Sequence, residues 1–284
     1  MVLEQWRRLP AALGQGNAGR QLALSESLLI GLDRPSLWWY SAGRPALVLG
    51  TSQKLQAVNL EYCRQHQIAV YRRTSGGAAV LSEPRFLSLD IALPPNHPFA
   101  PADIVKTYAW LGQTWLETLQ TLGLSKVKLV VPEEIRAAKN LNLVAEEAED
   151  DRLARLVCFG SLSPYEVVSE GRKLVGLAQV RRRAGTLLQC GLPFSSQTQA
   201  FAPLLKLLPS ESSLLSRLLS ERITSLDLAS GREISYEQVM EAFEQSLQRL
   251  WQVQPVAADW SSESLAQSER LESEKFIDLR QPIV

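Results

Sequence analysis

The apolar side chains of this chain recur with two different periods. Residues 86–93 alternate between the two sides of an extended segment, which predicts a strand. One face of this strand carries Leu87, Leu89, Ile91 and Leu93. Residues 101–122 instead repeat their apolar side chains at helical spacing, and Gly123 follows as a stop signal. The chain therefore contains both strands and amphipathic helices.

The same patterns predict the remaining elements. Short apolar runs between turn residues predict strands at 36–40, 45–53, 68–71, 126–131, 165–168 and 174–175. Helical spacing predicts helices at 19–31, 59–66, 201–219 and 265–276, and Ser235 with Gln238 forms a capping box for another. We expect an α+β fold, with a mixed or antiparallel sheet flanked by helices. Residues 1–284 are expected to form one domain, with a core at about 17–194 and a helical C-terminal part at about 195–284.

One acidic stretch interrupts this pattern. Residues 144–152, VAEEAEDDR, carry many carboxylates and no aromatic side chain, so we expect a mobile loop. A solvated insertion is the default interpretation, and a gate over a nearby site is the alternative.

Composition excludes several classes of function. The 284 residues are 45% hydrophobic and 21% charged, as in ordinary globular proteins. Lys+Arg 30 balances Asp+Glu 30, so we expect no general binding to nucleic acid. The basic cluster Arg181, Arg182 and Arg183 is either a local anion site or a solvated edge. Three cysteines do not suggest a disulfide framework, which favours a reducing cytoplasm. No signal peptide or membrane-spanning segment is expected.

Candidate chemistry lies in residues 158–191, where a cysteine and a lysine flank a predicted hairpin. Two successive hairpins, turning at 169–171 and at 184–185, would bring Cys158 and Lys173 together on adjoining strands. A thiolate is a good nucleophile, and a nearby ammonium favours it over the thiol. This pair predicts acyl transfer. The plainer alternative is a buried structural cysteine and a solvated lysine.

Two motifs resemble those of a known superfamily, and the first of them lies within residues 158–179. The string GRKLVGLAQ resembles the signature of lipoate and octanoate attachment enzymes, and CFGSLSPYEV resembles the cysteine region of their cysteine-dependent octanoyltransferase branch. The resemblance implies that Cys158 carries the acyl group as a thioester and that Lys173 tunes it. It also implies substrate-binding roles for Gly176 and Gln179.

The second motif is RRTSGGAAV, which resembles the glycine loop of the same superfamily, including biotin and lipoate ligases. Adjacent glycines let backbone N–H groups approach a ligand closely. The resemblance implies that the substrate-binding residues of this loop are Arg73, Gly76, Gly77, Ala78 and Ala79.

The chain departs from the superfamily at two positions. Ser82 and Cys190 stand where the superfamily generally has histidines, and the only histidines here, His66 and His97, lie in neither motif. An imidazole-dependent step is therefore not expected. We expect no metal site.

The resemblance implies an octanoyltransferase of protein lipoylation. It would take octanoate from acyl carrier protein onto Cys158 and pass it to a lysine of a lipoyl-domain protein such as the glycine cleavage H protein. Lys173 would lower the pKa of the thiol, and N–H groups near Gly76 and Gly77 would stabilise the oxyanion. No cofactor is expected, because exchange between thioesters is nearly isoenergetic. Apolar side chains would line a tunnel for the acyl tail, while at least two of Trp38, Trp39 and Tyr40 are expected in the core.

Three alternatives stay open from the sequence. An ATP-dependent lipoate–protein ligase of the same fold would use ATP and Mg²⁺ and would leave Cys158 without a role. An amidotransferase that moves octanoate between lipoyl domains would show the same Cys–Lys pair. A non-catalytic relative would keep the pocket and lack the chemistry.

Overall fold

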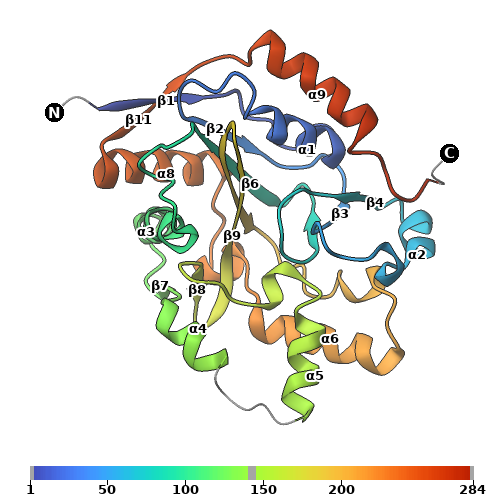
Figure 1. Cartoon of the computed structure of the whole chain (residues 1–284). Coiled ribbons are helices and arrows are strands. Elements are labelled where there is room, and N and C mark those ends of the chain that lie inside the picture. The colour runs from blue at the N-terminus through green and yellow to red at the C-terminus, as the bar shows by residue number, and fades with distance from the viewer. Residues whose placement is uncertain (1–2, 140–144, 282–284) are drawn as a thin grey trace.

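The computed structural model describes residues 3–139 and 145–281, which form two sheets with helices packed around them (Figure 1). Within these residues the larger sheet has eight strands. Their spatial order is β11 (Val253–Ala257), β1 (Glu4–Arg8), β2 (Ser36–Tyr40), β6 (Phe86–Leu93), β10 (Gly185–Pro193), β9 (Arg172–Arg182), β8 (Val167–Ser169) and β7 (Val127–Leu129). β1 is parallel to both neighbours, and the other pairings are antiparallel. The predicted fold class is confirmed.

The second sheet is smaller, and the helices surround both sheets. Its strand order is β4 (Ala69–Arg72), β3 (Ala46–Leu49) and β5 (Val80–Ser82). The α-helices are α1 (Ala18–Ser27), α2 (Leu60–Gln65), α3 (Ile104–Thr121), α4 (Pro132–Lys139), α5 (Ala145–Ala154), α6 (Pro209–Arg222), α7 (Leu226–Ser230), α8 (Tyr236–Trp251) and α9 (Ser262–Glu274). Single 3₁₀ turns are η1 (Leu55–Ala57), η2 (Cys158–Gly160) and η3 (Ala202–Leu204).

The larger sheet buries both faces. Helices α3 and α8 cover one face, where Trp39 of β2 packs edge-on against Trp115 and Phe243. Helix α1 covers the opposite face, where Trp38 packs with Leu28 and Leu29. Neighbouring residues of a strand point to opposite faces, so consecutive tryptophans serve two different cores. Trp38 and Trp39 are fully buried, which confirms the expected core packing.

The smaller sheet brings the two sequence motifs together. Its core contains side chains from β3 and β5 and from the α6 and η2 segments. A single parallel bridge joins Ala79 to Val157, and the Cys158 N–H donates to the Ala79 carbonyl at 2.9 Å. The loop after β4 therefore lies directly against the segment that carries Cys158.

Several predicted elements are confirmed. The strand at 86–93 has the predicted bounds, and its leucine and isoleucine face joins the main core. Both predicted hairpin turns occur: Gly171 has a φ of +79° and Gly185 a φ of +145°. The capping box of α8 is also present, since the Gln238 N–H donates to the Ser235 hydroxyl and the Gln238 side chain accepts from the Ser235 N–H.

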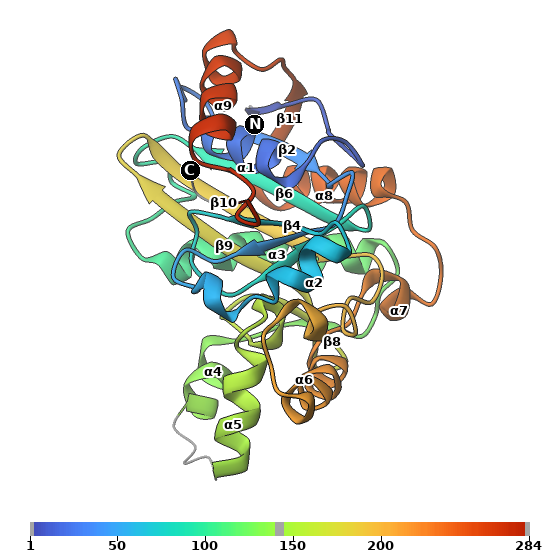
Figure 2. The ribbon, with the colours of Figure 1, turned by 90° about the vertical axis from the view of Figure 1, so that its right-hand side faces the viewer.

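The acidic loop prediction is wrong. Residues 145–154 form helix α5, while Val144 lies outside the described residues. The last turn of α5 buries Leu153 and Ala154, and Asp151 pairs with Arg222 of α6 at 3.3 Å. Figure 2 shows α5 and α6 together at the lower end of the molecule. These tertiary contacts outweigh the low local preference for structure.

Three strands were not predicted, namely β1, β11 and β5, the last of which lies in the segment interpreted as a glycine loop. One residue lies in a different element than expected. β1 and β11 pair with each other along their whole lengths, and Pro255 is on the edge strand, where its missing N–H costs no internal bond. Cys158 begins a 3₁₀ turn instead of lying on a strand. No helix among the described residues is long and apolar enough to cross a membrane.

Candidate active site

Cys158 lies half-buried at the start of η2. Its backbone is fixed by the hydrogen bond to Ala79, and its neighbours Val157 and Phe159 are buried in the core of the smaller sheet. Fixing the backbone on both sides of a half-exposed thiol leaves the sulfur accessible and the main chain rigid.

Lys173 lies beside the main chain of Cys158 and is almost completely buried. Its Nζ donates to the carbonyl oxygens of Cys158 and Ser161, each at 3.1 Å. It also forms an ion pair with Glu166 Oε1 at 2.7 Å, and both side chains are 2% exposed. The ammonium lies 5.0 Å from the centre of the Phe159 ring. The predicted proximity of Cys158 and Lys173 is therefore observed, but the contact is to the cysteine carbonyl.

Arg73 is the charged group that contacts the sulfur. Its Nη2 lies 4.0 Å from Cys158 Sγ and donates to the carbonyls of Gly76 and Ala78 at 2.8 and 2.9 Å. Gly77 has a φ of +90°, and a Cβ there would lie 3.0 Å from this nitrogen. The positive φ favours a glycine here, and a side chain would also crowd the Arg73 guanidinium.

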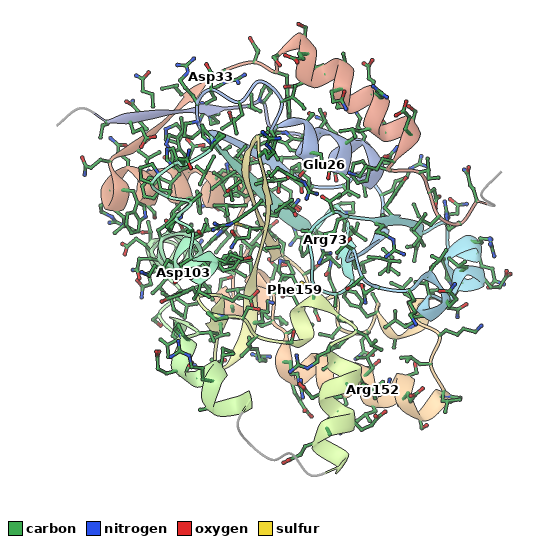
Figure 3. The ribbon with its side chains drawn as sticks, in the orientation of Figure 1. Glu26, Asp33, Arg73, Asp103, Arg152 and Phe159 are labelled. Atoms are coloured by element: carbon green, nitrogen blue, oxygen red, sulfur yellow. The ribbon has the colours of Figure 1, made fainter. Side chains whose placement is uncertain are left out.

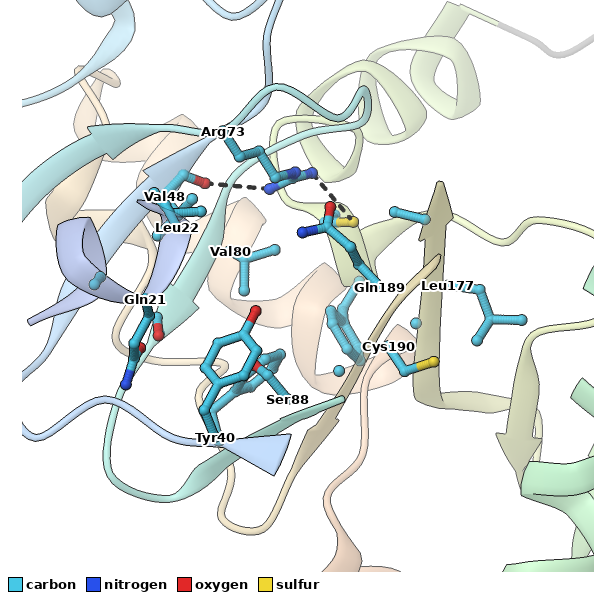
Figure 4. Close-up of a pocket in the computed structure, with 18 residues that line it drawn as sticks. Gln21, Leu22, Tyr40, Val48, Arg73, Val80, Ser88, Leu177, Gln189 and Cys190 are labelled. Atoms are coloured by element: carbon cyan, nitrogen blue, oxygen red, sulfur yellow. Dashed lines mark hydrogen bonds between the residues drawn. The ribbon is translucent and has the colours of Figure 1, made fainter. Parts of the chain in front are cut away.

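An apolar pocket opens beside Arg73 and Cys158 (Figure 4). It lies between the two sheets and has about 670 Å³ of empty volume, including its mouth. Its apolar lining consists of Ala18, Leu22, Val48, Val80, Phe86, Phe159, Gly176, Leu177, Ala178 and Gly191, and its polar lining of Gln21, Tyr40, Arg73, Ser82, Ser88, Cys158, Gln189 and Cys190. Arg73 and Phe159, which are labelled near the centre of the view in Figure 3, are both buried. Its mainly apolar lining with a few polar groups is typical of sites for small apolar ligands.

A buried carboxyl lies behind one wall of this pocket. Asp90 of β6 accepts hydrogen bonds from the Tyr40 hydroxyl at 3.3 Å and from the Ser25 hydroxyl, which in turn accepts from the Gln189 amide at 3.1 Å. Burial raises the pKa of Asp90 to about 7, and these hydrogen bonds oppose the rise. Gln21 also lines the pocket, and its Oε1 is buried without a hydrogen-bond donor among the described residues.

The structure brings most of the predicted site residues together. Arg73, Cys158 and Gly176 line the pocket, and the loop residues Gly76, Gly77, Ala78 and Ala79 lie beside them. A Cβ on Gly176 would lie 3.0 Å from the Phe159 ring, so this glycine makes room for it. Gln179 does not line the pocket, because its amide donates to the Ile104 carbonyl at the start of α3.

The two positions that depart from the superfamily histidines both line the pocket. Ser82 and Cys190 are 9% and 4% exposed, and burial raises the pKa of the Cys190 thiol. Arg181 of the basic cluster bonds to Gln179, Ala102 and Thr107, so its guanidinium ties β9 to the first turn of α3 and to the residue pair before it. No group of three or more metal-ligating side chains occurs within residues 3–139 and 145–281.

Glu166 and Asp90 were missed by the sequence analysis. Glu166 was visible in the PYEVV run, seven positions before Lys173 across a predicted hairpin. It lies directly before β8, whose Val168 pairs with Lys173 of β9. Asp90 was visible as a charged residue inside an otherwise apolar strand. A charged residue in a buried strand signals a functional or paired group.

Comparison with known proteins places this site in a family. The family model described as "Lipoyl protein ligase A/B catalytic domain" matches residues 17–248 of this chain. The octanoyltransferase LipM of Halalkalibacterium halodurans is 35% identical over 196 residues, which cover 66% of this chain and 65% of that protein. The LipM of Geobacillus kaustophilus is 30% identical over 86% of this chain and 85% of its own.

Solved structures show the same fold at low sequence identity. The bi-partite lipoate protein ligase of Thermoplasma acidophilum superposes with a TM-score of 0.75 at 16% identity over 100% of both chains. A lipoate-protein ligase A bound with ATP gives 0.70 at 18% identity, covering 97% of this chain and 96% of that one. The family match at residues 17–248 spans both motifs, and the folds agree over nearly the whole of each chain. This chain belongs to the lipoyl protein ligase A/B catalytic-domain family.

Proposed function

We propose that this protein transfers an octanoyl group from acyl carrier protein to a lysine of a lipoyl-domain protein, through a thioester on Cys158. The LipM relatives are octanoyltransferases, so the chain is an acyltransferase of protein lipoylation. The observation that carries the route is the position of Cys158, whose sulfur lies at an apolar pocket and against the Arg73 guanidinium.

The transfer has two balanced halves. The Cys158 thiolate attacks the carbonyl carbon of the donor thioester, a carbon–sulfur bond forms, and the donor leaves as a thiolate. The acceptor lysine then attacks the new thioester, a carbon–nitrogen bond forms, the amine releases a proton, and Cys158 leaves as a thiolate. The product amide is more stable than a thioester, so the reaction needs no ATP.

The residues around Cys158 suit these steps. The N–H groups of Gly77 and Ala78 donate to no acceptor among the described residues, which leaves them available to a developing oxyanion. The side chains of Val80, Phe86, Phe159 and Leu177 give the acyl tail an apolar surface. Lys173 acts as a positioning residue, because it holds the carbonyls of Cys158 and Ser161.

The acceptor in this proposal is a lipoyl domain such as that of the glycine cleavage H protein, and the compartment is the cytoplasm, where a free thiol stays reduced. No cofactor takes part. An ATP-dependent ligase, which the fold also accommodates, would use free octanoate or lipoate with ATP and Mg²⁺.

The test is intact-protein mass spectrometry after mixing the protein with octanoyl acyl carrier protein in the absence of ATP. We expect an octanoyl adduct on the parent and on Cys63→Ala, a matched control that removes a buried thiol remote from the pocket. We expect no adduct on Cys158→Ala. If a lipoyl domain is modified only after ATP and free acid are added, the ligase is the correct function. No modification under either condition would leave a non-catalytic relative.

A further inference from the structure

We infer that Gln189 holds the attacking amine of the acceptor lysine, by accepting a hydrogen bond from it through Oε1. Ser25 and Asp90 are positioning residues, because they fix the orientation of this amide. The inference rests on the proposed transfer through Cys158, and it names the group that receives the acceptor in the second half of that reaction.

Gln189 lies on the floor of the pocket. Within β10 it is the residue that is not buried, although β10 lies in the middle of the larger sheet. Its direct partners are Asp90 on β6 and Ala178 on β9. A side chain of an interior strand reaches solvent only where the layer above the sheet is open, and here that opening is the pocket, which Gln189 and Ala178 both line. Figure 4 shows the Gln189 side chain pointing toward Arg73, whose guanidinium contacts Cys158 Sγ.

Hydrogen bonds fix the orientation of the Gln189 amide. Its Nε2 donates to the Ser25 hydroxyl at 3.1 Å, and the Gln189 side chain also hydrogen-bonds to Asp90. The Ser25 hydroxyl gives its one proton to the Asp90 carboxyl, so it can only accept from Gln189. The amide nitrogen must therefore face Ser25 and Asp90, which leaves Oε1 to the pocket.

Oε1 of Gln189 is a free acceptor in this pocket. It receives no hydrogen bond from any residue in the ranges 3–139 and 145–281. A polar group in a mainly apolar pocket fixes the orientation of a ligand, and this one requires an N–H or O–H donor. An octanoyl thioester brings neither to the sulfur, since its carbonyl only accepts and its tail is apolar. The acceptor lysine brings N–H groups in every turnover.

The hydrogen bond to Gln189 strengthens as the reaction proceeds. When the nitrogen lone pair forms the carbon–nitrogen bond, the nitrogen becomes positively charged and its N–H groups become better donors. An interaction that is stronger in the transition state accelerates the step. The carbon–sulfur bond then breaks, and the proton lost by nitrogen ends on the Cys158 sulfur, so that amine and thioester give amide and thiol. Gln189 holds an N–H and takes no proton, because a neutral amide oxygen is a very weak base.

The experiment compares two nucleophiles on the same octanoyl-enzyme. Cys158 is loaded from a small-molecule octanoyl thioester, and the loaded protein is separated from the reagent. Intact-protein mass spectrometry then follows the loss of the octanoyl group to an unmodified lipoyl domain, whose lysine brings N–H groups, or to 2-mercaptoethanol, which attacks as a thiolate. The variants are Gln189→Met, Ser25→Ala and the control Gln197→Met, which removes a buried amide that does not line the pocket.

The measured quantity is the ratio of the rate with the lipoyl domain to the rate with 2-mercaptoethanol. We expect this ratio to fall roughly tenfold in Gln189→Met, as the loss of one hydrogen bond to a charged donor predicts. Ser25→Ala should lower the ratio by a smaller factor, because Asp90 still holds the amide. Gln197→Met should keep the ratio of the parent. A loss of packing would slow both nucleophiles and leave the ratio unchanged.

An unchanged ratio in Gln189→Met would overturn the inference. A variant that loads more slowly but keeps the parent's ratio would also overturn it, since Gln189 would then serve the acyl donor. If Gln189→Met does not fold, the ratio in Ser25→Ala decides in its place. A parent that takes up no octanoyl group overturns the proposed function as well, which separates that failure from failure of the inference alone.

Discussion

Glu166 and Asp90 are two fully buried carboxyls at the same site, and their surroundings are opposite. Glu166 meets the Lys173 ammonium and accepts from the N–H groups of Ser163 and Leu177 at 2.8 and 3.1 Å. Asp90 instead meets neutral groups, which are the hydroxyls of Ser25 and Tyr40 and the side chain of Gln189. Burial raises the pKa of both groups, and at Glu166 the lysine charge opposes that rise. The ion pair with Lys173 stabilises the charged form of Glu166. Asp90 has no such cation and stays protonated until the pH approaches neutrality.

Burial alone therefore does not decide whether an acidic side chain is ionised. The Glu166 pair holds the backbone of Cys158 and is structural in effect, because its charge is matched. The Asp90 cluster has an unmatched charge whenever it ionises, so the stability of the fold depends on pH through this residue.

Breaking the ion pair between Lys173 and Glu166 should produce the largest change in the free energy of unfolding. Lys173→Met leaves the Glu166 carboxylate buried without its cation, and we expect a loss of about 3–5 kcal/mol in the free energy of unfolding. The double variant Lys173→Met/Glu166→Gln should recover most of this loss. Urea denaturation of the single and double variants measures both values, and equal losses in the two would show that the pair does not act as a unit.

The second prediction concerns the pH dependence set by Asp90. The pKa of this carboxyl rises from 3.8 to about 7 on folding. The native state therefore keeps a proton that the unfolded chain has released, and stability should fall as the pH rises between these values. Asp90→Asn has no proton to lose, so it should be more stable than the parent above neutral pH, by a few kcal/mol on the order-of-magnitude linkage scale.

This advantage should shrink as the pH falls toward the lower value. Denaturation curves at a series of pH values measure it, with Asp33→Asn, which removes an exposed carboxyl, as the matched control. If the stability of Asp90→Asn and that of the parent change with pH in the same way, the raised pKa of Asp90 is contradicted.

The smallest expected effect on stability comes from removing a single hydrogen bond to Asp90. Tyr40→Phe removes one of the hydroxyl donors to Asp90. The ionised carboxylate loses more from this than the protonated acid, so we expect about 1–2 kcal/mol of destabilisation at alkaline pH and less under acidic conditions. Thermal melts at two pH values measure the difference. A loss of equal size at both would indicate that the hydroxyl serves packing and not Asp90.

The sequence predicted the parts of the fold whose signals are local. The alternation at 86–93 and the glycine turns at 171 and 185 each lie within a few residues, and each is confirmed. β1 and β11 were not predicted because their pairing joins residues about 250 positions apart, with Glu4 opposite Val253. Helix α5 was not predicted because the contacts that order it come from α6.

In the site, too, the sequence predicted some features and could not predict others. The motifs predicted Cys158 beside Lys173 and gave Arg73 a substrate-binding role, and the structure brings Arg73 to the cysteine across 85 positions. Spacing could not show which atom of Cys158 Lys173 contacts, since a shift of a few ångströms separates the carbonyl from the sulfur. Gln179 occupies the position that the motif gives to a substrate-binding residue, but its amide donates to the Ile104 carbonyl at the start of α3.

The pairing of β1 with β11 also bears on the order in which the protein can be completed during synthesis. Val253 leaves the ribosome long after Glu4, so one edge of β1 stays open until almost the whole chain has been made. An open strand edge is a template for pairing with other chains. Truncated products that end before β11 would expose this edge permanently and would be prone to aggregate, even though Cys158, Lys173 and Arg73 are all present in them.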